Sequence, residues 1–248
     1  MLFLRIFVSV LLSAIALCLL YVLFTFVCML FVDTRKEYKK NSKFYRFLLY
    51  SWTALALFVT NVKVRVTGAE KLPKGRFVLV ENHRSAYDAI VTWHAFRKCD
   101  LAFVSKQENF RIPMFGRLVR RCCFMAIDRE NARNALKTVA YACELMTSDE
   151  CSVAVYPEGT RNRGEGLLPF HNSVFKIAQK ANAPIVVVVA RGTDKIASRT
   201  PWKRSEVHLE VVEVISAEEV ASTRTVDLGE KISAKMLEYI TKHEGENE

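Results

Sequence analysis

Apolar residues gather first near the start of the chain, where no residue from Ile6 to Val32 carries a charge. At about 1.5 Å per residue, a helix over this stretch would be about 40 Å long, which exceeds the ~30 Å hydrocarbon core of a bilayer. The alternative is a secretory signal peptide, whose apolar region spans about 7–15 residues and ends in a small-residue cleavage site. The stretch is too long for that and lacks the site. We therefore predict a transmembrane anchor over residues 1–32.

A second apolar run, from Phe47 to Thr60, is too short for a comfortable span. Tyr45, Tyr50 and Trp52 suit the depth of lipid headgroups, which favours a helix lying in the membrane interface. The alternative is a helix packed on the core of the domain that follows. With the basic residues before it, this run makes residues 33–60 a juxtamembrane segment and interfacial helix.

From residue 61 onward, short apolar runs alternate with helical patterns. Strict alternation predicts a half-exposed strand at Val62–Val66 and an edge strand at Val207–Ile215. The other expected strands are 77–80, 101–104, 123–127, 152–156 and 185–190, and the expected helices are 86–96, 113–120, 132–146, 173–181 and 228–242. Such an order predicts an α/β domain over 61–248, with a mixed, largely parallel sheet flanked by helices.

The distribution of charge predicts how the chain is oriented in the membrane. The formal net charge is +10, and the cations after the first apolar run outnumber those before it: Arg5 precedes it, and Arg35, Lys36, Lys39, Lys40, Lys43 and Arg46 follow. The positive-inside rule therefore places the following domain in the cytoplasm. The basic surface is either simply solvated or attracted to anionic lipid at about 1 kcal/mol per cation. We expect no nucleic acid partner, because the sequence contains no motif that recognises DNA or RNA. The seven cysteines, without C-x-x-C, suggest neither a disulfide framework nor a metal site.

The first candidate motif, Asn82-His83-Arg84-Ser85-Ala86-Tyr87-Asp88, follows the strand expected at 77–80. Ligands of open α/β sheets bind beyond the carboxyl ends of the strands. With His83 in the loop and Asp88 in the first turn of the next helix, the carboxylate can orient the imidazole and leave one nitrogen as a base. The alternative is a capping box, in which Asp88 merely stabilises the helix start.

The second motif, Tyr156-Pro157-Glu158-Gly159-Thr160-Arg161, ends the strand expected at 152–156. Gly159 permits a tight turn or a positive φ, and Arg161 can bind a phosphate in bidentate fashion. The alternative is an ordinary turn that carries a surface arginine.

With these two motifs the chain resembles the glycerolipid acyltransferases, and most of all the 1-acyl-sn-glycerol-3-phosphate acyltransferases. The resemblance covers roughly residues 62–214 and the N-terminal apolar helices. Four blocks match in order: His83-x4-Asp88; Lys106-x-Glu108 with Pro113-x-Phe115-Gly116 and Ile127-Asp128-Arg129; Tyr156 to Arg161; and Ala183-Pro184-Ile185-Val186.

The resemblance implies transfer of a fatty acyl group from an acyl thioester, on coenzyme A or acyl carrier protein, to the sn-2 hydroxyl of lysophosphatidate. His83 would be the general base and Asp88 would orient it. The acceptor's glycerol phosphate would be held by Glu158, Gly159, Thr160 and Arg161, with help from Lys106 and Arg129. No cofactor or metal is expected, and the thioester is reactive enough to need no enzyme nucleophile. The expected partners are the membrane lipid acceptor, the thioester donor and the phospholipid bilayer.

Three departures from the family's pattern leave all of these groups in place: Asn109 after Lys-x-Glu, His171-Asn172 after Pro-Phe, and Val187 in the last block. The change at His171 keeps open a different lysolipid acceptor, including an aminolipid. A membrane-bound thioesterase or hydrolase could use the same His-Asp pair with water, although it would not need a phosphate site. A catalytically silent lipid-binding protein would not need the His-Asp pair at all.

Overall fold

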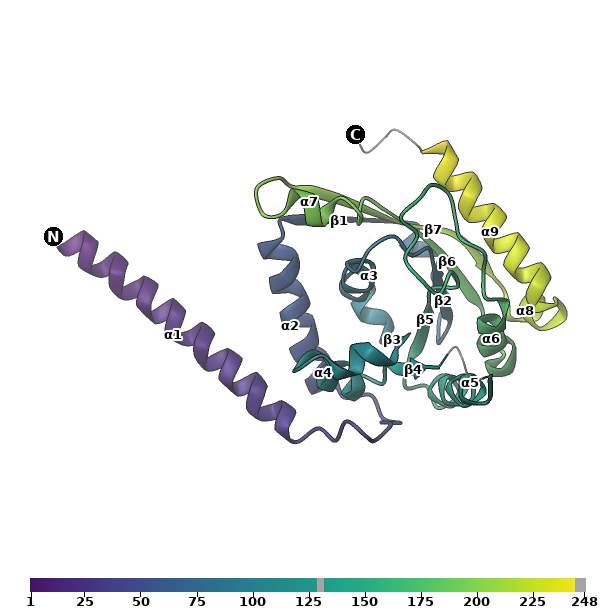
Figure 1. Cartoon of the computed structure of the whole chain (residues 1–248), viewed down its shortest axis with the longest axis horizontal. Coiled ribbons are helices and arrows are strands. Elements are labelled where there is room, and N and C mark those ends of the chain that lie inside the picture. Colours follow the sequence, from purple (N-terminus) through teal and green to yellow (C-terminus); the bar gives the residue numbers. More distant parts are fainter. Residues whose placement is uncertain (129–131, 244–248) are drawn as a thin grey trace.

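Within the part of the chain that the structure describes, seven strands form one sheet in the order β1-β7-β6-β2-β5-β3-β4. The computed structural model describes residues 1–128 and 132–243 (Figure 1). The strands are β1 Val62–Thr67, β2 Val78–Glu81, β3 Leu101–Lys106, β4 Met125–Ile127, β5 Ser152–Val155, β6 Ile185–Arg191 and β7 Ser205–Ile215. Every neighbouring pair is parallel except β6–β7, which is antiparallel. The predicted mixed, largely parallel sheet is therefore confirmed.

Helices cover both faces of this sheet (Figure 1). The helices of the described residues are α1 Leu2–Leu30, which projects from the domain, and α2 Lys43–Val59, α3 Asp88–Ala95, α4 Phe115–Arg121, α5 Ala132–Thr147, α6 Lys176–Ala181, α7 Ile196–Arg199, α8 Ala217–Ser222 and α9 Thr225–Lys242, with 3-10 turns at Ala69–Lys71, Arg97–Cys99, Gln107–Arg111 and Asn172–Phe175. One core cluster joins the sheet to α5, α6, α8 and α9, and a second joins it to α2, α3 and α4. Alternate residues of the inner strands β2, β3, β5 and β6 serve the two clusters, as a sheet buried on both sides requires.

The prediction of an edge strand at Val207–Ile215 is wrong. Strand β7 lies inside the sheet between β1 and β6, and the edges are β1 and β4. Alternating polarity reports how well each face of a strand is covered, and β7 does bury alternate residues over most of its length. The pattern contains no information about the ladder hydrogen bonds, which depend on strands distant in sequence.

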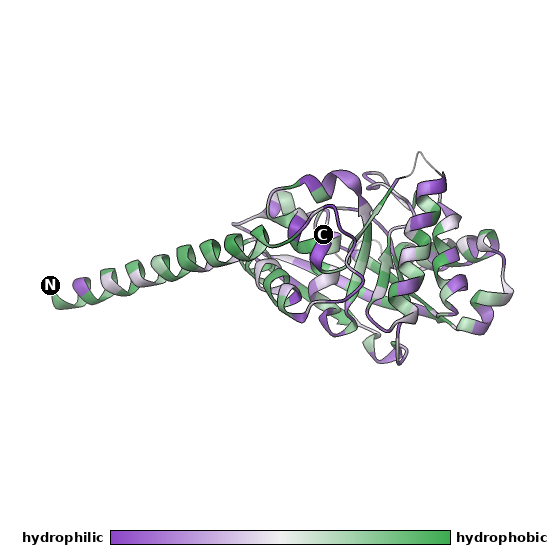
Figure 2. Cartoon of the chain, turned by 90° about the horizontal axis from the view of Figure 1, so that it is seen from below, coloured by the Kyte–Doolittle hydropathy of each residue, from purple (hydrophilic) through white to green (hydrophobic). Residues whose placement is uncertain are grey.

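Helix α1 projects from the domain (Figures 1 and 2). Residues 1–20 are all exposed, and α1 is the one helix of the described residues that is long and apolar enough to cross a membrane. Its last turns contact α2, where the Tyr45 hydroxyl donates to the Cys28 carbonyl at 2.9 Å and the rings of Phe24 and Phe44 lie 6.3 Å apart. The base of α1 is thus held against the domain.

Helix α2 packs one face on the core, as the alternative interpretation of the second apolar run expects. Its inner face belongs to the core, with Leu48 fully buried, while Phe47 and Leu55 on other faces are exposed. Whether the exposed face lies in a membrane interface stays a prediction.

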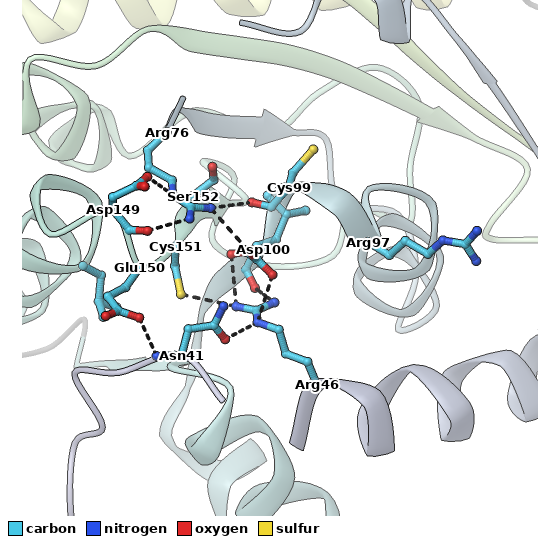
Figure 3. A network of polar contacts seen from close by, with 12 residues as sticks. Asn41, Arg46, Arg76, Arg97, Cys99, Asp100, Asp149, Glu150, Cys151 and Ser152 are labelled. Carbon is cyan, nitrogen blue, oxygen red and sulfur yellow. Dashed lines mark hydrogen bonds and ion pairs between the residues drawn. The ribbon is translucent and has the colours of Figure 1, made fainter. Parts of the chain in front are cut away.

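Arg46 of α2 fastens that helix to the sheet (Figure 3). Its guanidinium donates to the backbone carbonyls of Asp100 and Leu101, both at 3.0 Å, and lies 4.8 Å from the Trp93 ring centroid. Only 2% of Arg46 is exposed, so it does not belong to the cationic surface with which the sequence groups it.

Candidate active site

The loop that carries His83 leaves the carboxyl end of β2, in the interior of the sheet, and leads into α3. Asn82 pins the start of this loop. Its side-chain amide donates to the Ala190 carbonyl at 3.0 Å, and its oxygen accepts from the Ala190 N–H at 2.8 Å. The Asn82 side chain thus binds both backbone polar groups of Ala190 in β6, as a neighbouring strand would. The position of His83 is therefore fixed by backbone from a distant part of the chain.

Asp88 holds the imidazole of His83. Nδ1 of His83 lies 2.7 Å from Oδ2 of Asp88, and the same oxygen accepts from the N–H groups of Arg84 at 2.7 Å and Ser85 at 2.8 Å. A carboxylate can only accept hydrogen bonds, so Nδ1 carries the proton and Nε2 is left able to take one. Asp88 is also the first residue of α3, so one fully buried side chain both starts the helix and orients the histidine.

Tyr156 holds the plane of that imidazole. The two rings stack with centroids 4.2 Å apart at an interplanar angle of 19°, and Phe103 continues the stack behind Tyr156. The His83 side chain keeps 20% of its surface exposed. The sequence gives Tyr156 only as the first letter of a motif, and the stack joins strands whose adjacency no local pattern reveals.

Glu158 does not line the pocket, and both of its carboxylate oxygens accept hydrogen bonds from backbone N–H groups. Its Oε1 accepts from the His83 N–H at 2.7 Å, and its Oε2 accepts from the Leu168 N–H at 2.9 Å. The side chain is buried, and burial raises the pKa of this carboxyl above its usual value. The N–H of Asn162 donates to the His83 carbonyl at 2.7 Å. The second motif and the residue directly after it therefore hold both backbone polar groups of the residue expected to be the base.

The turn after Glu158 has the backbone that its glycine permits. Gly159 has φ of 71°, and its N–H donates to the Tyr156 carbonyl at 3.0 Å. A side chain is strained at such a φ, so glycine is the residue best suited here. The turn presents Thr160 and Arg161, both exposed, at the rim of a pocket.

That pocket, of about 430 Å³, is lined by both polar and apolar residues. The polar lining includes His83, Lys106, Thr160, Arg161 and His171, and the apolar lining includes Ala86, Ile90, Phe103, Phe115, Val119 and Phe124. The fold thus brings His83, Lys106, Gly159, Thr160 and Arg161 to one pocket, with Asp88 and Glu158 behind its wall. Arg129, the remaining candidate, lies outside the described residues.

A buried polar group lies behind the His83–Asp88 pair. Glu81, the last residue of β2, is fully buried, and its Oε2 accepts from the Thr92 hydroxyl at 2.7 Å. Within the described residues, Glu81 Oε1, Asp88 Oδ1 and the Tyr156 hydroxyl have no hydrogen-bond partner. Burial, reinforced by the charge of Asp88, raises the pKa of Glu81 well above its usual value. The one signal in the sequence is a carboxylate at the end of an otherwise apolar strand.

Known proteins share this architecture. A model of the family described as Acyltransferase matches residues 63–191. The chain is 30% identical over 193 residues to a 1-acyl-sn-glycerol-3-phosphate acyltransferase of Haemophilus influenzae, an alignment covering 75% of this chain and 80% of that one. It is 27% identical over 168 residues, 68% of each chain, to the protein so named in Salmonella typhimurium. The crystal structure of a 1-acyl-sn-glycerophosphate acyltransferase from Thermotoga maritima superposes with a TM-score of 0.68, at 19% identity and over 91% of this chain and 89% of that one. That last likeness concerns the fold.

Proposed function

Because this chain belongs to the Acyltransferase family, we propose that it transfers a fatty acyl group from an acyl thioester to the sn-2 hydroxyl of lysophosphatidate, giving phosphatidate. The observation that carries the proposal is the 2.7 Å contact between His83 Nδ1 and Asp88 Oδ2, at a pocket that Arg161 also lines. A proton acceptor beside a phosphate-binding cation is what acylation of a phosphorylated glycerol requires.

In the proposed reaction, Nε2 of His83 takes the proton of the acceptor hydroxyl as its oxygen attacks the thioester carbonyl. The tetrahedral intermediate collapses by breaking the C–S bond, and the proton returns to the departing thiolate. Asp88 supports the imidazolium that forms on the way. The donor is acyl-coenzyme A or acyl-acyl carrier protein, whose thioester makes a covalent enzyme intermediate unnecessary.

The pocket's two kinds of lining suit an amphipathic acceptor. Arg161 presents a planar fork to the acceptor phosphate, and Thr160 and Lys106 add a hydroxyl and an ammonium to the lining of the same pocket. The apolar lining would take hydrocarbon. Glu158 has both carboxylate oxygens occupied by backbone N–H groups, which supports a role in positioning His83 over direct contact with the acceptor.

The second candidate acceptor is another lysolipid, and the observation that favours it is that His171, one of the departures from the family's pattern, lines the pocket. Acyl transfer by the purified full-length protein should therefore be measured from one acyl thioester to each of three acceptors: lysophosphatidate, lysophosphatidylethanolamine and a lyso-aminolipid. We expect the highest kcat/KM with lysophosphatidate, and rescue of a bacterial strain lacking its own lysophosphatidate acyltransferase. A preference for another acceptor would replace the proposal, and fatty acid release without acceptor would indicate a thioesterase.

We also propose that α1 lies in the membrane with the catalytic domain on the cytoplasmic side. The support is the apolar length of α1 and the cations that follow it. Protease digestion of sealed inverted vesicles should remove the catalytic domain, and digestion of right-side-out vesicles should leave it intact.

A further inference from the structure

Trp202 has the most exposed large hydrophobic side chain among the described residues after α1, at 89%. It lies in the loop between α7 and β7. An indole left in water in a domain with two well-filled core clusters has no role in packing. Tryptophan is favoured where an apolar surface meets water, above all at the level of lipid headgroups.

The residues on both sides of Trp202 are hydrogen-bonded to the end of α2. The Thr200 hydroxyl donates to the Thr60 carbonyl at 3.3 Å, and the Ser205 N–H donates to the Asn61 carbonyl at 3.1 Å. The two residues that precede Thr60 are exposed apolar ones: Phe58 is 83% exposed and Val59 is 55% exposed. Trp202 therefore belongs to the same end of the molecule as the apolar tip of α2.

Cations accompany this apolar tip. Lys203 and Arg204 follow Trp202 directly and are exposed, and within the described residues neither has an ion-pair partner. An aromatic side chain beside unpaired cations matches the composition of protein segments at the surface of an anionic bilayer. Each such cation contributes about 1 kcal/mol of attraction near that surface.

The geometry puts this tip where a membrane would lie. Helix α2 has 17 residues and is about 26 Å long. Its first half contacts the base of α1, and the α7–β7 loop lies at its other end, on the side of the domain from which α1 projects (Figure 1). Helix α1, with 29 residues, is about 44 Å long, which exceeds the ~30 Å core and is accommodated by tilting.

We propose that the tip formed by Phe58, Val59 and residues 200–204 is a second membrane contact, which binds anionic lipid headgroups with Trp202 at headgroup depth. The inference rests on the proposed attachment through α1. A single transmembrane helix can rotate and change its tilt in the bilayer, and the domain held against its base would move with it. Two contacts about 26 Å apart fix the domain's orientation and hold the catalytic pocket at one angle to the lipid.

Tryptophan fluorescence tests this, because the chain has only Trp52, Trp93 and Trp202. Full-length protein is placed in phosphatidylcholine vesicles with or without phosphatidylglycerol, and co-flotation first shows that it is attached. The contribution of Trp202 is the difference between the native chain and Trp202→Phe. We expect brominated lipids to quench that contribution, and acrylamide to quench it several-fold less in anionic vesicles than in neutral ones.

Charge reversal supplies the matched control. Lys203→Glu with Arg204→Glu should abolish the bromolipid quenching of Trp202 in anionic vesicles. Lys176→Glu with Lys180→Glu, two exposed residues on α6 at the far side of the domain, should leave it unchanged.

Each other outcome is decisive. A chain that floats but leaves Trp202 open to acrylamide and untouched by bromolipid overturns the second contact while α1 attachment stands. Shielding from acrylamide without bromolipid quenching overturns it in favour of a protein contact, such as a second copy of the chain. A chain that fails to float overturns both the attachment and this contact. Acyl transfer to detergent-dispersed acceptor, measured separately, tests the proposed reaction independently of all three.

Discussion

Glu158 accepts a hydrogen bond from the backbone N–H of His83 at 2.7 Å, although 75 residues separate them. The two motifs are therefore one structure: the second forms part of the support on which the first stands. Because the other oxygen of Glu158 holds the Leu168 N–H, this carboxylate also ties the pocket rim to the loop that follows.

Glu158→Gln tests that support. The amide must turn its NH₂ toward one of two backbone N–H groups, leaving that donor unpaired at a cost of about 1–3 kcal/mol. We expect a lower melting temperature and a fall in kcat, with Glu165→Gln on the exposed part of the same loop as the control. If Glu158 instead bound the acceptor, the acceptor's KM would rise while the melting temperature stayed at the native value.

His83→Ala should abolish acyl transfer. Loss of a general base typically costs about 10²–10⁴-fold in rate. The imidazole lies in a loop with a fifth of its surface exposed, so the circular dichroism spectrum should not change. Retention of more than about a tenth of the native kcat would remove His83 from the mechanism.

Arg161→Lys keeps the charge but loses the planar fork. We expect the KM for the lysolipid acceptor to rise and the KM for the donor to stay near its native value. Arg163→Lys, an exposed neighbour that does not line the pocket, is the matched control. Equal effects of Arg161→Lys on both substrates would indicate a structural role for that arginine.

Glu81 should make stability depend on pH. Burial raises the pKa of this carboxyl in the folded protein. A group with a raised folded pKa contributes stability that is fully present below the unfolded pKa and lost as the pH rises through the folded one. Glu81→Gln removes that dependence. The melting temperature of the variant minus that of the native protein should therefore increase as the pH rises from acid toward alkaline. An unchanged difference across the range, as expected for exposed Glu70→Gln, would mean that Glu81 does not titrate this way.

Arg46→Met should loosen α2 from the sheet. The substitution leaves the Asp100 and Leu101 carbonyls without their donor, which we expect to lower the free energy of unfolding by about 3 kcal/mol. Arg97→Met, whose side chain points away from the network in Figure 3, should change it little. Denaturant titration of the two variants makes the comparison, and equal effects would show that Arg46 is not what fastens α2.

Local patterns predicted most of the elements, because the alternation of apolar residues in strands and their helical spacing reflect burial of one face. The bounds of strands β2, β5 and β6 were predicted to within one residue for this reason. The prediction that β7 is an edge strand was wrong. The alternation of its residues reflects which faces of the strand are buried, whereas its neighbours in the sheet come from distant segments of the chain. The short helices α7 and α8 were not predicted, since a helix of four or six residues shows no periodicity.

The sequence by itself determined the class of fold, the positions of the two motifs and the apolar length of α1, because each is written in neighbouring residues. Tertiary structure decided what each side chain faces. It turned Glu158 toward backbone, stacked Tyr156 on His83, buried Arg46 against the sheet and left Trp202 exposed. The physical reason is that hydrogen bonds, ring stacking and burial depend on groups brought together from far along the chain, and no local period records which groups those are.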